Sequence, residues 1–187
     1  GNAYVLGVGY QGVFRIGVDG AIDHVLTQTG DGMGNRLWGP IDVAANSDGD
    51  VFVAGRSSDN VFKMTSDGSI SEIIDINGAG AGSHLSEPQS IAIDDGGNVF
   101  VMGGSSSNVF QITTDGTITE IADSSGDGLG NEIGNTSSIA VDSRGNVYVG
   151  TYEHSTVLKI GPDGSIVKIL DSTGDGAGNI LTEVRAL

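Results

Sequence analysis

Two segments of the chain place side-chain oxygens at alternate positions of a glycine-rich loop. The segment DSSGDG begins at Asp123, and the segment DSTGDG begins at Asp171. Each has oxygen-bearing residues at relative positions 1, 3 and 5 and glycine at position 6, which is how a calcium-binding loop opens. They predict a weak calcium site with these ligands: Asp123, Ser125, Asp127, Asp171, Thr173 and Asp175.

The same loops allow a second interpretation, a turn that is held by its own aspartate. A complete calcium loop has a bidentate glutamate at position 12, where this chain has Gly134 and Thr182. Two related loops earlier in the chain have Thr27 at position 1 and Ala79 at position 5. A phosphate loop is disfavoured because no helix pattern and no P-loop lysine follow the glycines. We favour the turn, with calcium as the alternative and no other cofactor.

These loops also mark the phase of a repeat. The segments GNAYV, GDVFV, GNVFV and GNVYV follow one another at intervals of 48 residues without insertion, and they begin at Gly1, Gly49, Gly97 and Gly145. Repeat units of this kind bury their apolar faces only against their neighbours. We therefore predict one repeat domain over residues 1–187.

Each unit has the pattern of four short strands joined by Asp-Gly turns. In the third unit these strands are expected near 90–94, 99–103, 108–113 and 118–122. The second of them, VFVMG, is apolar on both faces, so its sheet must be covered on both sides. A two-sheet sandwich would leave one polar face. The sequence predicts an all-β protein, a β-propeller of four-stranded antiparallel blades with about four blades, as part of a larger ring or array.

The phase of the repeat also assigns individual side chains. We expect one aromatic or aliphatic position of the third strand to be buried between blades in every unit: Phe14, Phe62, Phe110 and Leu158. One position of the outermost strand is expected to be solvated: His24, Glu72, Glu120 and Lys168.

Composition narrows the classes of partner. The formal net charge of -16 argues against nucleic acid, whose phosphates require a basic surface. No apolar run is long enough to span a membrane, so membrane insertion is not expected. The chain has no cysteine, and its acidic, lysine-poor character favours an extracellular, cell-surface or periplasmic location.

Residues 138–150, SIAVDSRGNVYVG, together with residues 155–170, STVLKIGPDGSIVKIL, resemble an NHL repeat. The shared features are an apolar strand that ends in Val-Asp, a Gly-Asn turn and a Val-Tyr-Val strand. The resemblance extends over all units and implies the propeller fold. The units are longer than usual NHL repeats, and the excess lies in the Gly-Asp-Gly connector. The Asn-Asn-Arg-Val sequence that often opens the third strand is missing.

Propellers similar to NHL proteins include streptogramin lyases and lactonases, which use loop histidines and glutamates around a divalent metal. The resemblance implies His84, Glu87 and His154 as the catalytic candidates of a metal-assisted lyase or lactonase. However, His84 and His154 each occur in one unit only. Units this uniform favour a scaffold over an enzyme, because catalysis requires groups of different kinds at one place.

The sequence therefore predicts a non-enzymatic, extracytoplasmic repeat scaffold, and the metal-assisted enzyme remains the alternative. The expected partners are proteins or other repeat units of the same array. The residues predicted to make these interactions are Trp38, Arg56 and His154. Because the fourth unit is five residues short, we also expect an excerpt of a longer array, or assembly with other chains.

Overall fold

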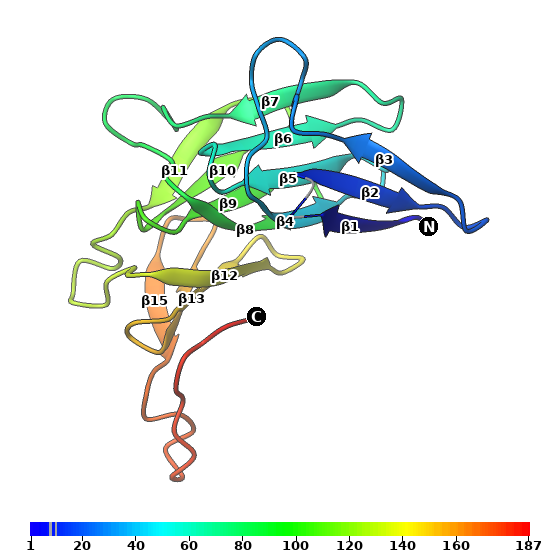
Figure 1. The fold of residues 1–187 in the computed structure, drawn as a ribbon. Helices are drawn as coiled ribbons and strands as arrows, with labels where there is room; N and C mark the ends of the chain where they lie inside the picture. The colour runs from blue at the N-terminus through cyan, green and yellow to red at the C-terminus, as the bar shows by residue number, and fades with distance from the viewer. Residues whose placement is uncertain (8, 10) are drawn as a thin grey trace.

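The computed structural model describes residues 1–7, 9 and 11–187. In this part of the chain the regular elements are fifteen short strands in four antiparallel sheets. The four sheets follow one another in a row along the chain, and the first and last sheets lie at opposite ends of that row (Figure 1). The described residues contain no helix that is long and apolar enough to cross a membrane.

The sheets repeat one order of strands. The first sheet has three strands: β1 (Ala3–Gly7), β2 (Gly12–Ile16) and β3 (Ile22–Leu26). The second sheet has four: β4 (Pro40–Ala45), β5 (Val51–Gly55), β6 (Asn60–Met64) and β7 (Ile70–Ile74). The third sheet has four: β8 (Pro88–Ile93), β9 (Val99–Gly103), β10 (Asn108–Ile112) and β11 (Ile118–Ala122). The fourth sheet has four: β12 (Thr136–Val141), β13 (Val147–Thr151), β14 (Thr156–Ile160) and β15 (Ile166–Leu170).

A carboxylate or amide holds each turn between the first two strands of a full sheet. In the turn from β12 to β13, the Asp142 carboxylate accepts hydrogen bonds from the backbone N–H groups of Arg144 and Asn146. It also accepts from the Asn146 side chain and the Tyr148 hydroxyl. These donors, with Asn146 first, lower the pKa of Asp142 to about 2. The Asp-Gly turns of the sequence are therefore specified locally.

The second and third sheets bury both faces. We call the face toward the preceding sheet the leading face, and the face toward the following sheet the trailing face. Between the second and third sheets, Phe52 and Val61 of the trailing face pack with Val101 and Phe110 of the leading face. Equivalent clusters fill the other two junctions. This stacking is that of propeller blades, as the sequence predicts.

The prediction for the third-strand ring position holds in three sheets of four. Phe62, Phe110 and Leu158 are fully buried at the junctions. Phe14 is only half-buried, because the leading face of the first sheet has no preceding sheet against it. It stacks instead on His24, with ring centroids 4.5 Å apart.

The prediction of a solvated outer-strand position is wrong for the second and third sheets. The buried Asn60 side chain donates to Glu72 Oε1 at 2.7 Å and to the Arg36 carbonyl at 3.1 Å. Asn108 makes the same pair of bonds to Glu120 and to the His84 carbonyl. Burial raises the pKa of Glu72. These glutamates help to tie each connector to its sheet.

Candidate binding face

The connectors between sheets and the loops between the second and third strands lie on one face of the molecule, which we call the connector face. The backbone N–H groups of Arg56 and Ser57 donate to the carbonyls of Gly39 and Trp38. At the next two junctions, Gly104 N donates to Glu87 O, and Tyr152 N donates to Asn135 O. The connector face is therefore made of the segments that the order of strands predicts for it.

In the first, second and fourth repeats a hydrogen bond fixes the connector to the loop of the preceding sheet, and we call it the latch. Asp59 Oδ1 accepts a hydrogen bond from Glu87 N at 2.7 Å, and Ser155 Oγ accepts from Glu183 N at 3.1 Å. Asp59, Glu87, Ser155 and Glu183 all have a positive φ. Left-handed backbone is uncommon for residues other than glycine, so the same conformation on both sides of two latches indicates a specified geometry.

The latch at the second junction places two predicted residues side by side. Arg56 Nη2 lies 2.9 Å from Glu87 Oε2, and both side chains are about half exposed. The Arg56 guanidinium lowers the pKa of Glu87, which keeps the carboxylate charged. The pair lines a hollow of about 470 Å³ together with Ser57, Asp59 and Ser86.

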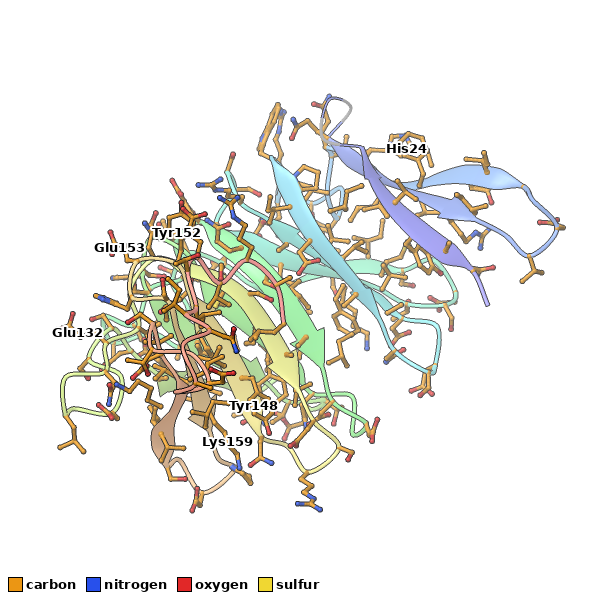
Figure 2. The ribbon with its side chains drawn as sticks, turned by 90° about the horizontal axis from the view of Figure 1, so that it is seen from below. His24, Glu132, Tyr148, Tyr152, Glu153 and Lys159 are labelled. Carbon is orange, nitrogen blue, oxygen red and sulfur yellow. The ribbon has the colours of Figure 1, made fainter. Side chains whose placement is uncertain are left out.

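The last latch carries a related group of side chains. The Tyr152 hydroxyl donates to Glu183 Oε1 at 3.0 Å, and Arg185 Nη2 donates to Glu183 Oε2 at 2.8 Å. The Arg185 guanidinium also lies over the Tyr152 ring at 5.6 Å. Figure 2 shows Tyr152 and Glu153 at one end of the last sheet, away from Tyr148 and Lys159 at its other end. In both latches the glutamate thus contacts an arginine with its side chain and a loop residue with its backbone N–H.

Trp38 is the large aromatic side chain of the first connector, and 39% of it is exposed. Its backbone N–H donates to Ser58 Oγ, so the residue is fixed to the loop that carries Arg56. Partly exposed aromatic and arginine side chains on a rigid backbone are typical of interaction hot spots. The structure thus brings two of the three predicted interaction residues to neighbouring positions, whereas His154 lies two sheets farther along the chain.

The candidate catalytic residues do not form one cluster. His84 Nδ1 lies 3.3 Å from the Ile76 carbonyl within its own connector, and Glu87 pairs with Arg56. His154 lies in the loop from β13 to β14, where it faces Gly134. Within the described ranges, no group of three or more acidic or histidine side chains could hold a metal ion. The predicted set is therefore spread over different junctions of the connector face.

The glycine loops use their aspartates on their own backbone. Asp127 accepts hydrogen bonds from the Asn131 side chain and from the backbone N–H groups of Leu129 and Asn131, and these donors lower the pKa of Asp127. Gly126 has φ of 61°, and a Cβ on it would overlap the carbonyl oxygen of Asn131. The loop therefore requires glycine at this position for both reasons. Asp175 is engaged in the same way, because it accepts hydrogen bonds from the Ala177 N–H and from the Asn179 side chain.

The first aspartate of each predicted calcium loop is engaged in the same way. Asp123 Oδ1 accepts from the N–H and the hydroxyl of Ser125, and Asp171 Oδ1 accepts from those of Thr173. The Thr173 hydroxyl and N–H, followed by Lys168, lower the pKa of Asp171 to about 2. These contacts are the ones that the turn interpretation expects, and the calcium interpretation stays a prediction.

A larger hollow lies on the opposite face, between the turns of the second and third sheets. It has a volume of about 700 Å³ and reaches down to Phe52, Lys63 and Val99. Lys63 pairs with Asp50 at 2.8 Å and lies over the Phe52 ring. The Lys63 ammonium in this hollow is thus already paired with a carboxylate.

No family model matches this sequence, and no curated protein matches it either. Solved structures do share its fold. Virginiamycin B lyase from Staphylococcus aureus matches with a TM-score of 0.69 at 19% identity, over 90% of this chain and 51% of that one. A putative gluconolactonase matches with a TM-score of 0.65 at 17% identity, over all of this chain and 62% of that one.

A nidogen/laminin complex contains a third match, with a TM-score of 0.63 at 18% identity over 87% of this chain and 59% of that one. All three of these neighbours are β-propeller proteins, and so the chain has a β-propeller fold. Its length spans about half of the lyase chain and about three fifths of the other two. At these identities the likeness concerns the fold alone.

Proposed function

We propose that this chain is an extracytoplasmic binding scaffold that presents its connector face to a protein partner. The observation that carries the proposal is that Trp38 is fixed to the loop from β5 to β6, which also carries Arg56. Trp38 is held by Ser58, and Arg56 is held by its backbone and by Glu87. Preformed backbone reduces the entropy that binding costs.

The charge of the face suggests the chemistry of the partner. Glu87 and Glu183 are kept ionised by arginines, and Glu132 and Glu153 add further carboxylates. With a net charge of -16, the chain repels anionic partners and attracts cationic ones. A peptide segment that combines lysine or arginine with an apolar residue fits both the carboxylates and the exposed indole ring.

An array of peptides with and without basic and aromatic residues tests this proposal. We expect the chain to retain peptides of the basic, apolar class, and we expect Trp38→Ala to weaken their binding at least about tenfold. Val18→Ala is the matched control, since Val18 is 81% exposed in the turn from β2 to β3 on the opposite face. Retention without preference for basic peptides, or equal loss in both variants, would contradict the proposal.

A metal-assisted lyase or lactonase is the second candidate. Its support is the fold shared with virginiamycin B lyase and with the putative gluconolactonase. His84, Glu87 and His154 are the residues proposed to act. The chain should be assayed with quinupristin, which is bound in another of the matched lyase structures, and with a sugar lactone, in each case with magnesium. Turnover that His154→Ala abolishes would favour the enzyme, and turnover unchanged by that substitution would exclude His154.

A further inference from the structure

The three junctions between sheets use the same pair of faces. At each junction an isoleucine or valine on the outermost strand of the trailing face packs against the next sheet: Val25, Ile73 and Ile121. On the leading face, an isoleucine near the start of the outermost strand packs in the opposite direction: Ile70, Ile118 and Ile166. A trailing face and a leading face are therefore complementary wherever the chain brings them together.

The first sheet exposes its leading face. Val5 is 47% exposed, whereas its equivalents Val53 and Val101 are at most 1% exposed. Ile22 is 68% exposed, although Ile70 at the same phase of the repeat is partly buried and packs against a core cluster. Figure 2 shows His24 on this sheet, at the far end of the molecule from the last sheet. The exposed residues are thus core residues that have no sheet against them.

The outermost strand of the last sheet exposes its trailing face. Val167 and Ile169 are each 49% exposed on β15. Ile169 has the repeat phase of Ile73 and Ile121, which both pack against a following sheet. Apolar side chains that gather on one face of a strand, rather than singly, indicate an interaction surface.

We propose that two copies of this chain associate head to tail, with the trailing face of the last sheet of one copy on the leading face of the first sheet of the other. The occupant follows from the repeat, because the two exposed faces are the two kinds that meet at every internal junction. In Figure 1 they lie at opposite ends of one molecule. The resulting contact is heterologous and closes a ring if its rotation permits.

Sedimentation velocity of the 187-residue chain, from about 1 to 100 μM, tests the association. We expect the mass to rise with concentration to that of a dimer. Ile22→Asp and Ile169→Asp should each raise the dissociation constant at least about tenfold, since an unpaired carboxylate would be buried. Leu129→Asp is the matched control, because Leu129 is 87% exposed on a connector. Each variant's unfolding midpoint shows whether it is folded.

A mixing experiment distinguishes head-to-tail association from symmetric pairing of like faces. Neither Ile22→Asp nor Ile169→Asp alone has both faces intact, so each should be monomeric. An equimolar mixture joins the intact trailing face of the first variant to the intact leading face of the second, and dimers should return. A monomeric wild type at every concentration, persistent self-association of either variant, or a mixture that stays monomeric would each overturn the proposal.

Discussion

The internal junctions and the outer faces of the end sheets contain the same residue types at the same phase of the repeat. Ile70, Ile118 and Ile166 pack into core clusters, whereas Ile22 is 68% exposed. The intrinsic preferences of these side chains are identical. The difference shows that burial here is a property of the neighbouring sheet and not of the residue, as expected for a chain that is quasi-one-dimensional.

The largest expected difference is between equivalent phenylalanines. Phe62→Ala should lower the free energy of unfolding by about 3 to 5 kcal/mol, because it removes a ring from a fully buried site. Phe14→Ala should cost less than half as much, since Phe14 is only half-buried on the outer face. Urea unfolding of both variants measures the difference, and equal losses would remove the distinction between the two regions.

A smaller effect is expected at the polar contact that joins connector and sheet. Asn60→Ala should cost about 1 to 3 kcal/mol, because the partly buried Glu72 and the Arg36 carbonyl lose their donor. The first sheet has Gly12 at this phase, and a Cβ there would meet the His24 ring. His24→Ala, the control on the outer face, should change stability by no more than about 0.5 kcal/mol in the same urea assay. A larger loss for His24→Ala would show that its stacking on Phe14 replaces the amide contact.

The effect of acid on stability tests the Asp142 turn, whose contacts lie within one sheet and do not depend on packing between sheets. The pKa of Asp142 is about 2 in the folded chain and about 3.9 in an unfolded one. The stabilisation by this carboxylate is therefore complete above about pH 4 and is lost as the pH falls toward 2. In thermal melts, the difference in midpoint between wild type and Asp142→Asn should shrink over this range. A difference that stays constant from pH 5 to about pH 2 would contradict this assignment.

The smallest effect is expected from calcium. Asp123 and Asp127 already accept bonds from their own loop, so about 1 mM calcium should leave the melting temperature unchanged. A rise of several degrees that Asp127→Asn abolishes would instead support the calcium interpretation. Asp163→Asn, in the turn from β14 to β15, serves as a control for a general charge effect.

Much of the fold could be predicted from the sequence, because the turns and the two-sided apolar strands recur at a fixed spacing. The apolar segment VFVMG, for example, predicts a sheet covered on both faces, and Val99 and Val101 are buried as expected. The exposure of Val5 could not be predicted in this way. The periodic pattern describes an average unit, whereas the number of neighbours differs between the inner and the end sheets.

Less of the candidate site could be predicted from the sequence. Arg56 and Glu87 are 31 residues apart, with strands β6 and β7 between them, so no local pattern joins them. Likewise, the phase of the repeat predicts Glu72 in solvent because it lies on the outermost strand of its sheet. The signal that indicates its contact is an asparagine at one phase, Asn60 and Asn108, which in each case begins a strand and precedes two buried apolar residues.

The latch has a consequence for how genes of this kind lengthen. Its acceptor and donor are 28 residues apart in Gln11 and Gly39, in Asp59 and Glu87, and in Ser155 and Glu183. An in-frame duplication of 48 residues, begun at any codon, preserves this spacing between the repeated positions. The ends of the duplicated segment therefore need not coincide with the ends of a sheet. Arrays of different length can therefore arise by single events in which the acceptor and donor positions stay 28 residues apart.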